Sequence, residues 1–162
     1  MALSVHTRRT RRGPAVAAAI GFVGNAIFQI ALAAGAPAGR AAWGGADAQL
    51  STPERIGSAV AVVVWMAAAL TVLGRAGFWS LGKRERVFRW GTWVLVGVNG
   101  VSALANFASS SRWENLVWGP TAAVLAVLCT LVARSDAHTQ ALPIPGGGNL
   151  SGDAAPAVGT RV

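Results

Sequence analysis

Hydrophobic residues in this chain are gathered into four long runs that contain no Asp, Glu, Lys, Arg or His. The runs cover residues 14–39, 56–74, 90–111 and 115–133. A helix needs about 20 mostly apolar residues to cross the core of a bilayer, and each run has that length. A buried helix of a soluble protein explains one such run, but the remaining polar residues are too few to cover four. The pattern therefore predicts an all-α, up-down-up-down bundle of four transmembrane helices, with spans at about 14–38, 55–74, 89–110 and 113–133.

The residues that flank the second run are typical of helix ends. Thr52 followed by Pro53 fits an N-cap with proline at the first helical position, and Ser51 with Glu54 has the spacing of a capping box. Gly74 is expected to end this helix. These signals support the boundaries predicted from hydrophobicity alone.

The turn before the fourth run repeats the capping-box spacing with Ser111 and Glu114. It predicts a tight hairpin between the third and fourth helices, with these two residues as its cap or, alternatively, as an outer recognition site. Pro120 lies inside the fourth run and removes one backbone donor, so a kink beside Gly119 is expected. If residues 112–119 formed an interfacial turn instead, the helix from Pro120 would be too short to cross a bilayer.

The chain outside the runs divides into a basic N-terminal segment, residues 1–13, and a C-terminal tail, residues 135–162. The tail is rich in Ser, Thr, Pro and Gly and shows no periodicity, which predicts disorder. Residues 14–134 are expected to form the four-helix membrane domain.

The distribution of charge predicts the orientation of the chain. Only 12% of the residues are charged, and the net charge is +8. If the N-terminus is cytoplasmic, the cytoplasmic segments hold eleven Lys and Arg against three acidic residues, whereas the outer loops hold three of each. Basic residues accumulate on the cytoplasmic side of membrane proteins. We therefore expect a multi-pass protein of the cytoplasmic (inner) cell membrane with both termini inside and the lipid bilayer as its partner. The basic charge then needs no nucleic acid to explain it.

The first run also has two features of a cleaved signal peptide. It follows a basic segment, and it contains the small-residue sequence Ala36-Pro37-Ala38. Its length of about 25 residues exceeds the roughly 7–15 residues of a signal core, which favours a retained span. Cleavage would leave three spans.

Tryptophans lie near both ends of the predicted spans. Trp113 and Trp118 fall at the outer boundary, and Trp90 and Trp93 fall at the inner one. This distribution is typical of interfacial anchors.

Groups suited to catalysis or to cofactor binding are scarce within the runs. His6 and His138 lie outside the runs, and Cys129 is the only cysteine. A haem between the helices would lack imidazole ligands, and a proton-coupled exporter would lack a carboxylate within its spans. The sequence predicts neither an enzyme nor a cofactor or metal site.

Uncharged polar side chains gather at the middle of the predicted bundle and toward its outer side. Asn25, Trp65 and Asn99 fall near the midplane of the first, second and third helices. Gln29 lies one turn further out than Asn25. Ser102 and Asn106 follow Asn99 at i+3 and i+7, on the same face of the third helix.

Two hypotheses explain this polar layer. In the leading one, its amides bond between helices, one of them accepts the Trp65 N–H, and four glycines allow close approach. The protein would then be non-enzymatic and act by association, with itself or with another membrane protein. In the alternative, the layer is a pocket open to the outer side that binds or transports a small molecule or a lipid headgroup. The glycines are Gly21, Gly24, Gly97 and Gly100.

The outer hairpin resembles a known type of sequence. The segment Asn106-Phe-Ala-Ser-Ser-Ser-Arg-Trp-Glu114-Asn-Leu-Val-Trp118-Gly-Pro120 is similar to the same hairpin in small, uncharacterised four-helix membrane proteins of actinobacteria and other bacteria. The resemblance covers mainly residues 90–134. It implies a bacterial membrane protein family but no activity, so it transfers no functional residue.

Overall fold

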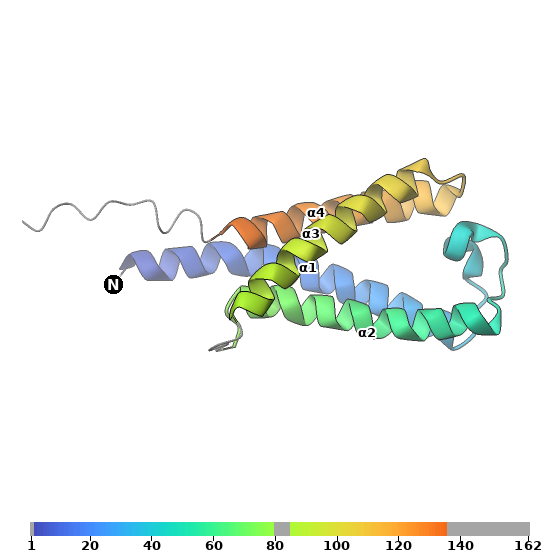
Figure 1. Cartoon of the computed structure of the whole chain (residues 1–162), viewed down its shortest axis with the longest axis horizontal. Coiled ribbons are helices and arrows are strands. Elements are labelled where there is room, and N and C mark those ends of the chain that lie inside the picture. Colours follow the sequence, from blue (N-terminus) through green and yellow to red (C-terminus); the bar gives the residue numbers. More distant parts are fainter. Residues whose placement is uncertain (1, 80–84, 136–162) are drawn as a thin grey trace, which may run out of the picture.

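The computed structural model describes residues 2–79 and 85–135, with side chains from Arg12 onward. These residues form helices and turns without strands, which confirms the predicted all-α fold. The main helices are α1 (Ala2–Ala33), α2 (Thr52–Arg75), α3 (Glu85–Ala108) and α4 (Gly119–Arg134) (Figure 1). A π-helical turn, η4 (Glu114–Trp118), leads into α4, and two 3₁₀ turns, η1 (Gly39–Ala41) and η2 (Trp43–Gly45), lie between α1 and α2.

Four segments are long and apolar enough to cross a membrane, which agrees with the prediction of a multi-pass membrane protein. They are Arg12–Ala33, Thr52–Arg75, Glu85–Ala108 and Glu114–Arg134. The first helix ends five residues before the predicted boundary of the span. Gly35 has a φ of +95°, a conformation that side chains rarely adopt and that ends a helix.

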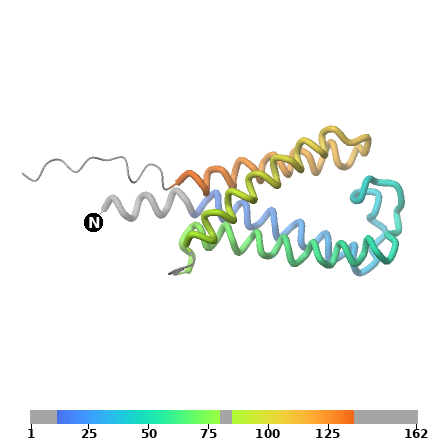
Figure 2. The backbone as a smooth tube through the Cα atoms, viewed as in Figure 1, coloured from blue at the N-terminus to red at the C-terminus, as the bar shows by residue number. Residues whose placement is uncertain are grey.

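The four helices run up and down in chain order. α1 packs most extensively against α2, and α3 packs against α4; contacts of α1 with α4 and of α2 with α3 close the bundle (Figure 2). We term the end that carries residues 34–51 and 109–113 the loop end. The opposite end, with Arg12, residues 76–79 and Arg134, is termed the termini end.

The two clusters of packed, buried apolar residues lie in the half of the bundle nearest the termini end. Most of their residues are small, so the helix backbones approach closely there, as in many membrane bundles. The main cluster consists of Ala18, Ala19, Phe22, Ala68, Ala69, Val72, Leu125 and Cys129, and a second cluster consists of Ala15, Ala76 and Val132.

Only one of the four glycines expected at helix contacts lies at such a contact. A Cβ added to Gly21 would be 2.8 Å from Leu125 Cδ2, so α1 and α4 are close at this point. Gly24, Gly97 and Gly100 have open space where a Cβ would be. The expectation for these three was wrong, because no neighbouring helix of the described residues approaches closely at these positions.

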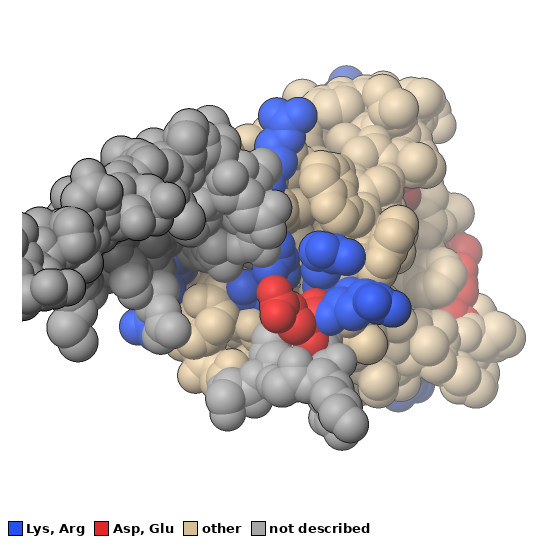
Figure 3. All heavy atoms as spheres, turned by 60° about the vertical axis from the view of Figure 1, so that its left-hand side comes forward, with Lys and Arg blue, Asp and Glu red and all other residues tan. Residues whose placement is uncertain are grey.

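Charged side chains differ between the two ends. Among the described residues, the termini end holds five arginines and Glu85, and basic side chains gather on that end in Figure 3. The loop end holds Arg40, Arg55 and Arg112 with Asp47, Glu54 and Glu114. Several residues used in the sequence-based predictions lie outside the described part of the chain. They are the side chains of His6, Arg8, Arg9 and Arg11, the residues Lys83 and Arg84, and the predicted tail from Asp136 onward, which includes His138, Asp153 and Arg161.

Tryptophans at the helix ends fall into two groups. Trp90, Trp93 and Trp113 are exposed, as anchors at a membrane surface would be. Trp118 is partly buried and faces the interior of the bundle. It lies near the loop end, as predicted, but it contacts the cavity instead of the membrane surface.

Candidate binding pocket

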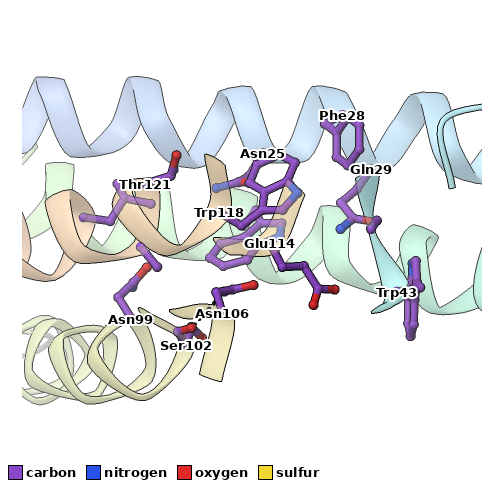
Figure 4. Close-up of a pocket in the computed structure, with 14 residues that line it drawn as sticks. Asn25, Phe28, Gln29, Trp43, Asn99, Ser102, Asn106, Glu114, Trp118 and Thr121 are labelled. Carbon is purple, nitrogen blue, oxygen red and sulfur yellow. Dashed lines mark hydrogen bonds between the residues drawn. The ribbon is translucent and has the colours of Figure 1, made fainter. Parts of the chain in front are cut away.

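A cavity of about 190 Å³ lies in the half of the bundle nearest the loop end (Figure 4). All four helices, η4 and the loop before α2 contribute to its wall. The structure brings together the whole predicted polar layer here, since Asn25, Gln29, Trp65, Asn99, Ser102 and Asn106 all line the cavity. The other lining residues are Phe28, Ala42, Trp43, Glu114, Trp118, Thr121, Ala122 and Leu125.

The amides of α3 form hydrogen bonds within their own helix. Asn99 Nδ2 donates to the Leu95 carbonyl at 2.8 Å, and Asn106 Nδ2 donates to the Ser102 carbonyl at 2.8 Å. Among the described hydrogen bonds, none joins a residue of the polar layer to another helix. The expected bonding between helices is therefore absent from this layer in the described part of the chain, and the amide oxygens of Asn99 and Asn106 keep their acceptor capacity.

Two further members of the layer also depart from the expected bonding. Trp65 stacks on Phe22 with ring centroids 5.7 Å apart, and no hydrogen bond of the described residues joins its indole to Asn25 or Asn99. The Gln29 Oε1 atom is buried and has no hydrogen-bond partner. An unsatisfied buried acceptor costs about 1–3 kcal/mol.

Aromatic side chains form much of the remaining wall. Phe28 and Trp118 are in contact, with centroids 5.0 Å apart and planes tilted by 43°. Trp43 extends from the loop before α2 and forms part of the cavity wall. Its Nε1 donates to the Oγ of Ser58, a buried residue of α2, at 3.2 Å. With Trp65, four rings line the cavity, and three of them were missing from the predicted site.

The loop before α2 has the backbone conformation that directs Trp43 toward the bundle. Trp43 has a φ of +52°, and the following Gly44 and Gly45 have φ values of +83° and +75°. Glycine adopts such angles without strain, whereas tryptophan does so only when its contacts compensate. Gly57 supplies such a contact, because a Cβ there would lie 2.6 Å from the Trp43 ring.

The same loop is joined to the turn between α3 and α4. The Gly44 N–H donates to Glu114 Oε1 at 2.8 Å, and the Trp118 indole N–H donates to the Ala41 carbonyl. These bonds connect segments about 70 residues apart in sequence. They hold the loop against the open end of the cavity.

The cap of the second hairpin differs from the prediction in its partner. Glu114 Oε2 accepts from Ser109 Oγ at 2.5 Å, and Ser109 Oγ accepts from the Ser111 N–H at 3.1 Å. The pairing of Ser111 with Glu114 was therefore wrong, because the other Glu114 oxygen is taken by Gly44. The capping box predicted from Ser51 and Glu54 is confirmed, since Glu54 Oε2 accepts from both the N–H and the hydroxyl of Ser51. The N-cap is Ser51, so the N-cap predicted at Thr52 was one residue late.

Pro120 is accommodated by a π-helical turn instead of a simple kink. The Gly119 N–H bonds to the Glu114 carbonyl, five residues back, so the turn widens before the proline. The helix thus continues past Pro120 and brings Glu114, Trp118 and Thr121 to the cavity. A Cβ on Gly119 would lie 2.9 Å from the Phe107 ring, so α3 and α4 are in close contact at this level.

The only formal charge among the described residues of the cavity wall is negative. Among the described residues that line the cavity, Glu114 alone is ionisable, and Glu114 makes no ion pair within the described part of the chain. No group of three or more His, Cys, Asp or Glu among the described residues could hold a metal ion. The wall offers amide acceptors, aromatic rings and one carboxylate.

Comparison of the chain with protein-family models, with curated proteins and with solved structures found no match. The resemblance of residues 90–134 to bacterial four-helix membrane proteins therefore stays a prediction. Four helices of the described residues are long and apolar enough to cross a membrane, as in a multi-pass membrane protein.

Proposed function

We propose that this protein binds a small polar molecule in the cavity at the loop end, and that this end faces the outside of the cell. The observation that carries the proposal is the convergence of six polar-layer residues on one cavity without hydrogen bonds between helices. Binding pockets in membrane proteins commonly lie near the midplane, where helices meet. Amide groups with free acceptor capacity in such a place are suited to a ligand.

Charge supports the orientation. The termini end carries five described arginines against one acidic residue, whereas the three basic and three acidic residues of the loop end balance. Because Lys and Arg near helix ends favour the cytoplasmic side, the termini end belongs in the cytoplasm of a bacterial cell under this proposal. The cavity then receives its ligand from outside.

Association within the membrane remains the second candidate function. The large apolar side chains of α2 and α3 that face outward, such as Val63 and Leu104, are suited to lipid or to another helix equally. The polar layer gives association less support than expected, because the amides of Asn99 and Asn106 bond within α3. Ligand binding and oligomer stability, measured in the same variants, separate the two functions.

The protein is purified in mild detergent and examined by native mass spectrometry for a retained small molecule. Tryptophan fluorescence is then followed during titration with a panel of neutral, anionic and cationic solutes, since Trp43, Trp65 and Trp118 line the cavity. Binding to the unmodified protein is compared with binding to Asn106→Leu. The matched control is Asn115→Leu, because Asn115 lies outside the cavity and bonds to the Phe107 carbonyl.

A second matched pair lies within α4. Thr121 and Thr130 both donate to the carbonyl four residues back, at 2.7 and 2.8 Å, but only Thr121 lines the cavity. The proposal expects Thr121→Val and Asn106→Leu to weaken binding at least fivefold while both controls bind normally. Unaltered binding in folded cavity variants, or no bound solute across the panel, would refute it. Loss of a stable oligomer in the same variants would favour association instead.

A further inference from the structure

We infer that the ligand of this cavity is a small organic cation that carries an alkylammonium group, with the aromatic rings and Glu114 as its binding partners. The inference rests on the proposed function and adds the chemical class of the ligand. Three observations of the cavity support it, namely its charge, its aromatic wall and its size.

The charge of the wall favours a cation. Glu114 is the only ionisable residue among the described residues that line the cavity, and no described Arg or Lys pairs with it. Its two hydrogen bonds, from Gly44 and Ser109, use part of the acceptor capacity of a carboxylate, which has about four lone-pair sites. A partly buried carboxylate without a counter-charge is stabilised by a cation beside it. An anionic ligand would meet repulsion from the same group.

The aromatic wall supplies a second attraction of the same sign. Phe28, Trp43, Trp65 and Trp118 come from four different elements and surround the cavity. The face of an aromatic ring is negative, and cations bind within about 6 Å of it, with tryptophan the strongest partner. Three tryptophans on one small cavity therefore suit an ammonium ion whose charge is spread over alkyl groups. The amide oxygens of Asn99 and Asn106, whose Nδ2 atoms bond within α3, can accept from an N–H or from a bound water.

Size limits the ligand to a few carbon atoms. The cavity of about 190 Å³ is only moderately larger than engineered cavities of roughly 150 Å³ that hold a benzene molecule. A quaternary ammonium ion with methyl or ethyl groups matches this space, whereas a nucleotide or a disaccharide does not.

Two sources could present this chemical group. A soluble amine would enter from the loop end. A lipid headgroup is the other source, because a shallow apolar groove between α1 and α4 shares Thr121 and Leu125 with the cavity and continues along Gly21 and Leu128 on the outside of the bundle. An alkyl chain in that groove would place its ammonium headgroup near the cavity.

The test measures binding by isothermal titration calorimetry to the full chain in phosphatidylglycerol nanodiscs. The probes are tetramethylammonium, tetraethylammonium, choline and 3,3-dimethyl-1-butanol, the neutral carbon analogue of choline. We expect at least one cation to bind, and we expect the neutral analogue to bind at least tenfold more weakly than choline. Repetition in nanodiscs that contain phosphatidylcholine distinguishes the sources: a lowered apparent affinity identifies a lipid headgroup as the occupant, and an unchanged affinity identifies a soluble cation.

Two matched pairs of variants assign the binding to the cavity. Glu114→Gln removes the charge and should weaken cation binding at least tenfold, whereas Glu54→Gln removes a loop-end carboxylate outside the cavity and should not. Trp43→Leu should weaken binding at least threefold, whereas Trp113→Leu should not, because Trp113 lies at the same end and is similarly exposed but does not line the cavity. The tryptophan pair keeps the test decisive if Glu114→Gln fails to fold.

The outcomes separate this inference from the proposed function. Equal binding of choline and its neutral analogue, or cation binding that survives both Glu114→Gln and Trp43→Leu, would overturn the cation as the ligand. Binding of a neutral or anionic solute in the cavity without binding of any cation would overturn the inference but leave the proposed function standing. Absence of binding for every class of solute would overturn both.

Discussion

The backbone N–H of Gly44 donates a hydrogen bond of 2.8 Å to the carboxylate of Glu114, and this bond joins the two helical hairpins at the loop end. One partner lies between α1 and α2, and the other lies on the π-helical turn before α4. The same carboxylate caps the second hairpin through Ser109. The Glu114 side chain thus holds the loop of residues 39–45 beside the cavity and also forms part of the cavity wall.

Replacement of Glu114 by Ala should loosen the loop of residues 39–45. Hydrogen bonds to charged groups contribute about 1.5–3 kcal/mol, and 1.4 kcal/mol corresponds to a tenfold change in an equilibrium. Hydrogen–deuterium exchange at residues 39–45 should therefore rise by about tenfold or more. Arg112→Ala, at an exposed neighbouring position, is the control and should leave exchange unchanged. Equal protection in Glu114→Ala and the parent would show that this bond does not hold the loop.

The cap of the second hairpin can be tested with two serines. Ser109→Ala removes one bond to Glu114 and one from the Ser111 N–H, and should destabilise the protein by about 1–3 kcal/mol. Ser111→Ala removes no described hydrogen bond of the side chain and should change stability by less than about 0.5 kcal/mol. Thermal unfolding in detergent measures both. The reverse order would restore the pairing of Ser111 with Glu114 that the sequence predicts.

The contact between Gly21 and Leu125 should tolerate no large side chain. Gly21→Leu would force a buried leucine of α4 away and should cost about 1–3 kcal/mol, the usual range for an overpacked core. Gly24→Leu is the matched control, because a Cβ at that position meets open space. Unfolding midpoints of the two variants should differ clearly. Similar midpoints would mean that α1 and α4 are not in close contact there.

Gly57→Ala should displace the Trp43 ring without touching the other walls of the cavity. The new Cβ would lie 2.6 Å from the ring, and the shift should also break the bond to Ser58. We expect altered tryptophan emission and ligand affinity reduced at least threefold, as in Trp43→Leu. Gly97→Ala, on a face with open space, should bind normally. An emission spectrum identical to that of the parent would contradict the described position of Trp43.

The orientation predicts which end a membrane-impermeant maleimide can reach in intact cells. Cys129 is buried and is replaced by Ala to give a cysteine-free background. Asp47→Cys at the loop end should then be labelled, and Glu85→Cys at the termini end should be labelled only after the cells are opened. The opposite result would invert the topology and place the cavity toward the cytoplasm.

The helices and the polar layer could be predicted from sequence because both depend on periodicity. Asn99, Ser102 and Asn106 share one face of a helix through their spacing alone. Asn25 and Trp65 could be placed at the same level because each span has a measurable centre. Such arguments need only the geometry of a helix and the thickness of a bilayer.

Other parts of the site depend on contacts between distant segments. Trp43 reaches the cavity only because three consecutive residues adopt positive φ values, which hydrophobic patterning does not encode. The partner of Glu114 is 70 positions away, so local spacing favoured the nearby Ser111 instead. Gly97 and Gly100 could not be distinguished from contact glycines because composition does not reveal which face a helix turns to its neighbour.

The end of the cavity nearest the termini end is closed by apolar side chains. Trp65 and Leu125 line the cavity and also pack into the buried apolar core, where Trp65 stacks on Phe22 next to several alanines. Under the proposed function, a solute that enters at the loop end meets this apolar layer about halfway through the bundle. On the same proposal, the stacked Phe22 and Trp65 rings close the binding cavity toward the termini end.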